Sequence, residues 1–194
     1  TPSYIRFTAS AERIYQFNPN AKLIFVIRNP IDRAFSHYWH QKRKRKLSFK
    51  FIDALYYNDV GNYDLFESWL ASGCYARLLQ PYLAIFPREQ IHLELFDDLE
   101  ADPSAYLRRV FSFMGVEPDF QPSVLRKRIN VGAEVFKPGA WRRFLVRLGL
   151  SGSVSIDEYS AGIPEKLREE LRIYYAPHNL ELSKLIGRDL SHWG

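Results

Sequence analysis

Two side chains near the start of the sequence have the types and the spacing to bind one anion. Arg28 directly follows the apolar run Leu23 to Ile27, and Ser36 lies eight residues further along the chain. An arginine offers a charged fork of N–H donors and a serine offers a hydroxyl group, and both recognise phosphate-like oxygens. If the backbone brings them together, the two side chains form an anion site.

A strand that turns sharply into a helix would bring them together. The run Leu23 to Ile27 is apolar without interruption, which predicts a strand buried on both faces. Pro30 has the fixed φ and the missing N–H that suit the first helical position, and Asn29 can cap the free amides. Ser36 then lies about two helical turns onward, on the side facing the carboxyl end of the strand. In open α/β sheets, ligands bind at that end.

Three further polar residues, Arg33, His37 and His40, recur at helical spacing on the same side of this helix. His40 lies four residues after Ser36, and a free imidazole, with a pKa of about 6.5, can orient an acceptor hydroxyl or take its proton. The alternative for His40 is a surface histidine bonded to a carboxylate or to water. His37 would turn away from the anion, and we expect Arg33 to brace the helix against an acidic residue.

The rest of the chain reads as helices around a second strand. Helices are expected over 9–17, from 48, and over 75–86, 102–114, 164–175 and 179–186, with a parallel strand over 91–96. Ser10 and Asp102 are the expected caps, Phe17 and Met114 are expected on buried sides, and Gly115 should end its helix. Helices between strands predict an α/β fold, with three layers and a mostly parallel sheet, in a single domain over residues 1–194.

Composition limits the class of protein. The 194 residues, 46% of them hydrophobic, suffice for one core, and no apolar run reaches the roughly 18 residues of a membrane span. The single cysteine, Cys74, permits no internal disulfide and reads as a small buried hydrophobe. The five histidines show no zinc-like spacing, so no metal is expected.

The charge favours acidic ligands without choosing among them. The net charge is +5 and the pI is about 9.3, and much of the excess lies in the run Lys42 to Lys46. This run is either a solvated helix end or a surface that attracts a polyanionic acceptor or a nucleotide. No recognised nucleic-acid-binding motif accompanies it, so we expect no nucleic acid partner.

The string Arg28-Asn29-Pro30-x-x-Arg33-Ala34-x-Ser36 resembles the 3'-phosphate-binding segment of the sulfotransferases that use 3'-phosphoadenosine 5'-phosphosulfate (PAPS). Further matches follow in order, at Thr1-Pro2-Ser3-Tyr4, Gly73-x-Tyr75, 86–99, Phe113-x-Gly115, and Gly187-Arg188-Asp189 before Trp193. They are most similar to the heparan-sulfate-sulfotransferase-like and bacterial branch. The resemblance implies a P-loop-NTPase-like sulfotransferase fold, PAPS as co-substrate without a metal, and 3'-phosphate contacts from Arg28 and Ser36.

The resemblance also implies transfer of a sulfuryl group to a hydroxyl or amine of a carbohydrate or another acceptor. The related N-sulfotransferases carry a histidine at the offset of His40, beside the acceptor, which makes His40 the catalytic candidate. A basic, glycine-containing loop closes over the nucleotide in this family, and Arg128 is the preferred match, with 137–141 as the alternative segment. The family's first strand and 5'-phosphosulfate loop would precede Thr1, so we expect this stretch alone to be inactive.

Two other function classes stay open. A P-loop nucleotide kinase shares the architecture, but it predicts a Walker loop and an acidic metal-binding residue after the central strand, where Arg28-Asn29-Pro30 stands. A noncatalytic polyanion-binding protein predicts salt-sensitive binding with no preference for a 3'-phosphate. The expected acceptor is an acidic glycan or a small metabolite, and the pattern sets no oligomeric state. The lone cysteine favours a cytoplasmic location, with the Golgi lumen as the alternative.

Overall fold

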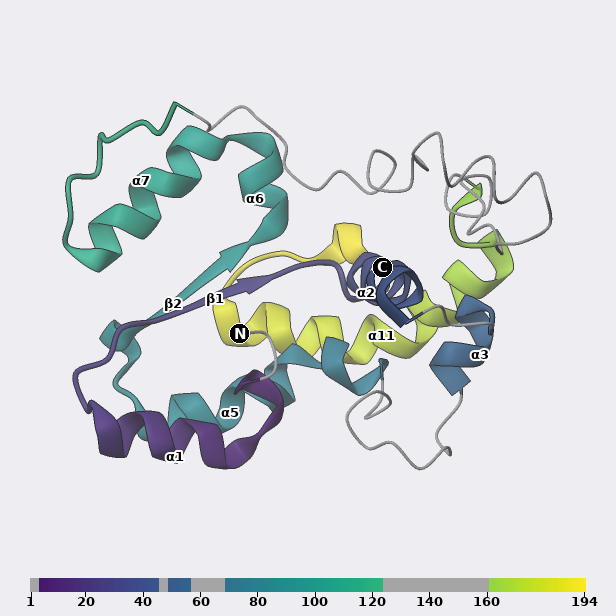
Figure 1. The fold of residues 1–194 in the computed structure, drawn as a ribbon, viewed down its shortest axis with the longest axis horizontal. Helices are drawn as coiled ribbons and strands as arrows, with labels where there is room; N and C mark the ends of the chain where they lie inside the picture. Colours follow the sequence, from purple (N-terminus) through teal and green to yellow (C-terminus); the bar gives the residue numbers. More distant parts are fainter. Residues whose placement is uncertain (1–3, 46–48, 57–68, 124–160) are drawn as a thin grey trace.

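A computed structural model describes residues 4–45, 49–56, 69–123 and 161–194. The helices of more than one turn are α1 (Thr8–Phe17), α2 (Pro30–Arg45), α3 (Phe51–Tyr56), α5 (Tyr75–Ile85), α6 (Phe96–Ala101), α7 (Pro103–Met114) and α11 (Glu165–Ile186). The strands are β1 (Leu23–Ile27) and β2 (Ile91–Leu95). Short 3-10 helices lie at Tyr4–Arg6, Ala71–Gly73, Arg88–Gln90 and Ser191–Trp193. Figure 1 shows α6 and α7 on one side of the two strands and α1 and α5 on the other.

The two strands are parallel, as the sequence predicted, and their register aligns Ile27 with Leu95. One face of the pair is covered by a hydrophobic core. Phe25 and Leu93, directly opposite each other on this face, pack into the core made with α5 and α11. Because the strands end level with each other, the residues that follow them, Arg28 and Phe96, leave the sheet side by side.

The opposite face is covered only along β2. Glu94, 2% exposed, accepts two hydrogen bonds from Arg109 of α7, at 2.9 and 2.8 Å. On β1, Ile24 is 38% and Val26 51% exposed. The prediction of a strand buried on both faces is therefore wrong for β1 in the described ranges. Helix α7 packs against β2 on this face, and within the described ranges it leaves Ile24 and Val26 of β1 exposed.

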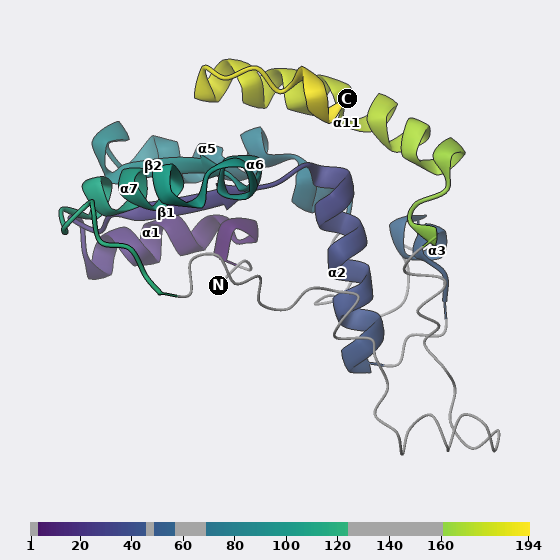
Figure 2. The same cartoon turned by 90° about the horizontal axis from the view of Figure 1, so that it is seen from above.

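Helix α2 turns sharply away from the carboxyl end of β1, and α11 passes beside its start (Figure 2). The inner side of α2, including Ile31 and Tyr38, forms a core with Leu171 and Tyr175 of α11 and with α3. Gly73 lies against this start, because a Cβ there would stand 2.7 Å from the Pro30 Cβ and 2.7 Å from Tyr175 Cε1. Close approach at Gly73 therefore sets where α2 begins.

Helices α1 and α7 test the predicted caps and helix ends. Asp102 caps α7 by accepting from the amides of Ser104 and Ala105, both at 3.0 Å, and Gly115 ends α7 with φ 78°. Ser10 is not the cap of α1, which begins at Thr8 after Phe7, without a side-chain cap. Phe17 is 92% and Met114 47% exposed, so both predictions of burial are wrong. Each lies in the last turn of its helix, beyond the core it was expected to cover.

The helices expected over 164–175 and 179–186 are one helix, α11, that continues through Pro177. A proline inside a helix removes one backbone hydrogen bond and usually bends or ends it, and the axis of α11 changes direction along its length in Figure 2. Burial continues on both sides of the proline, at Leu171, Tyr175 and Leu182. Packing of this inner side offsets the lost hydrogen bond. Helix propensity alone therefore did not predict that the helix continues through Pro177.

Candidate functional site

The turn from β1 into α2 is held in place by a local cap and by hydrogen bonds to two distant segments. Asn29 caps α2 as predicted, because its Oδ1 accepts from the Ile31 amide at 2.9 Å. The Asn29 Nδ2 donates to the carbonyl oxygen of Trp193 at 3.5 Å, near the end of the chain. The Tyr75 hydroxyl, at the start of α5, donates to the Arg28 carbonyl oxygen at 2.8 Å. The backbone that carries Arg28 is therefore fixed before any ligand binds.

The Arg28 side chain keeps its hydrogen-bond donors available. Its guanidinium carbon lies 4.9 Å from the centroid of the Phe96 ring, the first residue of α6. Stacking on a ring face uses none of the five N–H donors of an arginine. Within residues 4–45, 49–56, 69–123 and 161–194, no carboxylate or carbonyl oxygen accepts a hydrogen bond from this guanidinium. These donors can therefore bind an anion.

Ser36 is exposed on α2, and in the same described ranges its hydroxyl has no hydrogen-bond partner. His40 follows one turn later and is also exposed. Both residues lie on the side of α2 opposite its core contacts with α11. The structure thus leaves the predicted serine and histidine accessible to a ligand that approaches from the outer side of the helix.

Arg33 and His37 face a different neighbour. Arg33 Nη2 donates to the carbonyl oxygen of Trp69 at 2.5 Å, so this arginine braces the helix as expected. Among the described residues its acceptor is this carbonyl rather than the expected acidic residue, and the nearby Asp32 pairs with Arg168 of α11 at 3.5 Å. One Arg33 nitrogen is therefore committed to a backbone carbonyl, while its buried Nε has no hydrogen-bond partner among the described residues. Arg28 differs in that none of its donors has an acceptor in these ranges.

His37 packs against the buried Trp69, with ring centroids 4.8 Å apart. Burial, and then the nearby charges of Arg33, His40 and Arg6, together lower the pKa of His37 from 6.5 to about 4. The imidazole is therefore uncharged at neutral pH. This placement agrees with the expectation that His37 turns away from the anion site.

The C-terminal segment, which the sequence marked as part of the family resemblance, also reaches this site. Asp97, directly after Phe96, accepts a hydrogen bond from Trp193 Nε1 at 2.6 Å and lies 2.9 Å from His192 Nε2. Its neighbour Asp98 accepts from Arg188 Nη2 at 2.9 Å, and this bond holds the pKa of Asp98 below its usual value. The level ends of two parallel strands were the signal that could have placed Phe96 beside Arg28.

The remaining predictions concern the basic segments, the cysteine and possible metals. Arg128 lies outside the described residues, as does the segment 137–141. Lys42, the first residue of the basic run, lies 4.9 Å from the Trp39 ring centroid. Cys74 is buried, 6% exposed, as predicted. Among the described residues, no three His, Cys, Asp and Glu side chains cluster to hold a metal ion, and no helix is long and apolar enough to cross a bilayer.

Comparison with known proteins gives one consistent result. The sequence model described as "Sulfotransferase family" matches residues 1–122. Mouse heparan sulfate glucosamine 3-O-sulfotransferase 3B1 is 29% identical over 195 residues, which cover 97% of this chain. Mouse bifunctional heparan sulfate N-deacetylase/N-sulfotransferase 4 is 28% identical over 204 residues, covering 98% of this chain.

A solved structure agrees with this result. The crystal structure of a sulfotransferase from Alicyclobacillus acidocaldarius superposes with a TM-score of 0.73, at 29% sequence identity and over 98% of this chain. The match covers 64% of that bacterial chain, 48% of the mouse 3-O-sulfotransferase and 22% of the bifunctional enzyme. The fold is the α/β sulfotransferase fold that the sequence predicted.

Proposed function

We propose that this chain, which belongs to the sulfotransferase family, forms the 3'-phosphate end of a PAPS site and takes part in sulfuryl transfer to a hydroxyl or amine acceptor. The observation that carries the proposal is the Arg28 guanidinium, whose N–H edge has no acceptor in the described ranges although its backbone is fixed at the end of β1. An arginine placed in this way binds a phosphate through two parallel N–H donors. Ser36 adds a hydroxyl from α2, the helix that follows Arg28.

In this reaction the bond between sulfur and the phosphate oxygen breaks while a bond from sulfur to the acceptor oxygen or nitrogen forms. The released nucleotide leaves as adenosine 3',5'-bisphosphate, and the acceptor loses a proton. Positioning and electrostatic stabilisation dominate the closely related phosphoryl transfers. Arg28 and Ser36 position the nucleotide, and His40, exposed one turn after Ser36, takes the acceptor proton. Arg128 is proposed as a further nucleotide contact.

For the acceptor we favour an acidic glycan. The named relatives act on heparan sulfate, according to their names, and this chain has a net charge of +5, with five consecutive basic residues at 42–46. A basic surface attracts polyanionic chains at long range. The single cysteine, buried and reduced, supports a cytoplasmic location over the Golgi lumen.

The test is thermal stabilisation of the full-length protein by adenosine 3',5'-bisphosphate compared with adenosine 5'-monophosphate. A ligand at 100 times its Kd stabilises the native state by about 2.7 kcal/mol, which raises Tm by roughly 5–10 °C in a protein of this size. We expect that shift from the bisphosphate, and at least a threefold smaller shift from the monophosphate. The two nucleotides differ only in the group that Arg28 and Ser36 bind.

Repeating the measurement at two salt concentrations separates this site from general anion binding. A noncatalytic polyanion-binding protein would respond to each nucleotide according to its charge and would lose both shifts at high salt. Equal or absent shifts from a folded protein would overturn the proposal. A bisphosphate shift that largely survives high salt supports it.

A further inference from the structure

Five residues around the β1–α2 turn form a closed ring of contacts. Arg28 stacks on Phe96, with 4.9 Å between guanidinium carbon and ring centroid. Asp97, bonded covalently to Phe96, accepts from Trp193 Nε1 at 2.6 Å. The carbonyl oxygen of Trp193 accepts from Asn29 Nδ2 at 3.5 Å. Asn29 is bonded covalently to Arg28, which closes the ring through three segments distant in the sequence.

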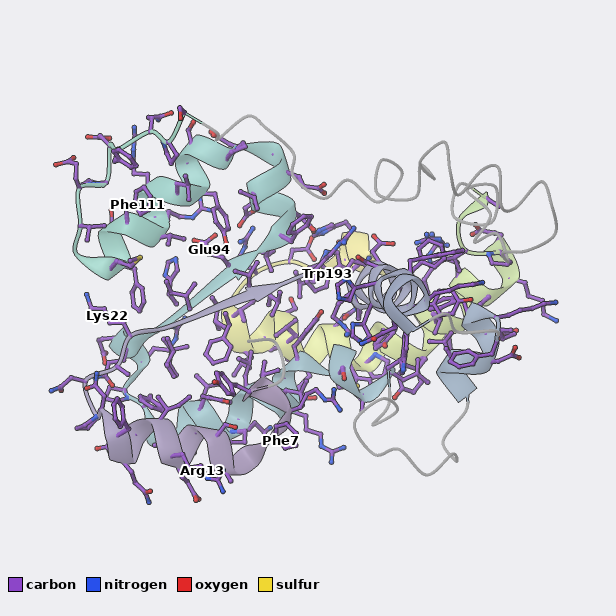
Figure 3. The ribbon with its side chains drawn as sticks, in the orientation of Figure 1. Phe7, Arg13, Lys22, Glu94, Phe111 and Trp193 are labelled. Carbon is purple, nitrogen blue, oxygen red and sulfur yellow. The ribbon has the colours of Figure 1, made fainter. Side chains whose placement is uncertain are left out.

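Packing and hydrogen bonds fix the residues of this ring of contacts. Trp193 is 2% exposed and belongs to the core with Leu95 and Leu190, so its indole is fixed by packing as well as by Asp97. Asn29 is fixed on its other side by capping α2. Figure 3 shows Trp193 near the turn that joins β1 to α2. The Phe96 ring is therefore a defined platform against which a flexible arginine can rest.

Such a platform matters for a phosphate-binding arginine. The side chain has several rotatable bonds, and fixing it costs up to about 2 kcal/mol of conformational entropy when a ligand binds. Stacking the guanidinium plane on an aromatic face sets its orientation beforehand and leaves its N–H edge open. A ligand then binds to donors that already point in one direction.

We propose that Phe96 is a positioning residue for Arg28, that Trp193 and Asp97 hold Phe96 in place, and that this ring sets the preference for a 3'-phosphate. The inference rests on the proposed function, because it assigns how the nucleotide site is organised. Phe96 acts through Arg28 rather than on the phosphate. Its removal should thus weaken recognition of the 3'-phosphate while recognition of the rest of the nucleotide persists.

The test measures Kd for adenosine 3',5'-bisphosphate and adenosine 5'-monophosphate in the full-length protein, with Phe96→Leu as the principal variant. Leucine keeps the apolar volume and removes the ring face. The preference is the Kd for the monophosphate divided by the Kd for the bisphosphate. We expect this ratio to fall about three- to tenfold, the range of one cation–π contact, while the Kd for the monophosphate stays within about twofold of wild type. Phe96→Tyr keeps the aromatic ring face and should keep the wild-type ratio.

Two further variants test the ring itself. Trp193→Phe removes the indole donor to Asp97 and should lower the ratio in the same direction as Phe96→Leu. Phe113→Leu is the matched control, because Lys22, just before β1, lies 5.5 Å from the Phe113 ring centroid in a comparable pair far from Arg28. This control should leave the ratio unchanged. In an Arg28→Ala background, Phe96→Leu should have no further effect on the ratio.

The outcomes distinguish a failure of the positioning role of Phe96 from a failure of the proposed function. A wild-type protein without preference for the bisphosphate refutes the proposed function. A wild-type preference that survives in Phe96→Leu overturns the positioning role while the proposed function stands. An equal loss of both nucleotides also overturns it, because that pattern indicates direct contact between Phe96 and the nucleoside. Melting temperatures of the variants without nucleotide establish that each one is folded.

Discussion

Protonation of His37 should destabilise the folded chain as the pH falls from about 6.5 to about 4. Its pKa in the folded protein is lowered to about 4, from an ordinary value of 6.5, by burial and then by the charge of Arg33. Between these two values the unfolded chain binds a proton that the folded chain excludes. Stability is therefore complete above pH 6.5 and is lost as the pH falls towards 4, below which both states are protonated.

The size of the effect follows from the shift. One pKa unit corresponds to about 1.4 kcal/mol, so a fall in pKa from 6.5 to about 4 sets an upper limit of about 3.5 kcal/mol. The ring is half-buried against Trp69 rather than fully enclosed, and solvent screening reduces this to a loss on the order of 2 kcal/mol. In a protein of this size that loss lowers Tm by roughly 4–8 °C.

The assay is urea unfolding at several pH values between 4 and 7, for the wild type and for His37→Phe. Phenylalanine keeps an aromatic edge against Trp69 and cannot titrate. Subtracting the two curves removes every other group that titrates in this range. The difference in unfolding free energy should change by about 2 kcal/mol across the interval. Parallel curves would show that His37 is protonated equally in both states, and the burial argument would then be wrong.

Three further predictions concern the site directly. Gly73→Ala should lower the free energy of unfolding by about 1–2 kcal/mol, since the overlap at 2.7 Å with Pro30 and Tyr175 outweighs the smaller entropic gain of alanine. Denaturant midpoints measure this change, with Ser72→Ala as the control. Arg28→Ala should reduce bisphosphate affinity tenfold or more, a charge-assisted bond being worth about 1.5–3 kcal/mol, while Tm without ligand stays within about 2 °C; calorimetric titration and melting test both. His40→Ala should slow turnover by about 10²-fold or more at nearly unchanged nucleotide affinity, and unchanged turnover would return His40 to the class of surface histidines.

The strand-to-helix turn could be predicted from sequence because its chemistry is local. The amide cap of Asn29 and the fixed φ of Pro30 act within three residues, and the structure places both as expected. The same holds for Asp102, whose carboxylate caps α7. Local hydrogen bonds of this kind depend little on the rest of the fold.

Other features depend on contacts that sequence patterns do not encode. Periodicity ended a helix near Tyr175, but burial at Leu182 carries α11 through Pro177. Phe17 fits an apolar pattern and is 92% exposed, because the core against α1 ends one turn earlier. Trp193 reaches Asn29 across 164 positions of sequence. Each outcome was decided by tertiary packing, which overrides local preference.

Arg28 and Arg33 illustrate what separates a binding arginine from a structural one. Sequence places both on the same short stretch, and both are half-buried. Arg33 is opposed by the carbonyl oxygen of Trp69, which takes up a donor, whereas Arg28 is opposed by the face of Phe96, which orients the group without using one. The difference arises because Arg28 follows the end of a strand that ends level with its parallel neighbour, so that Phe96 faces it across the sheet. Strand register, more than residue spacing, therefore decides which of the two arginines can hold an anion.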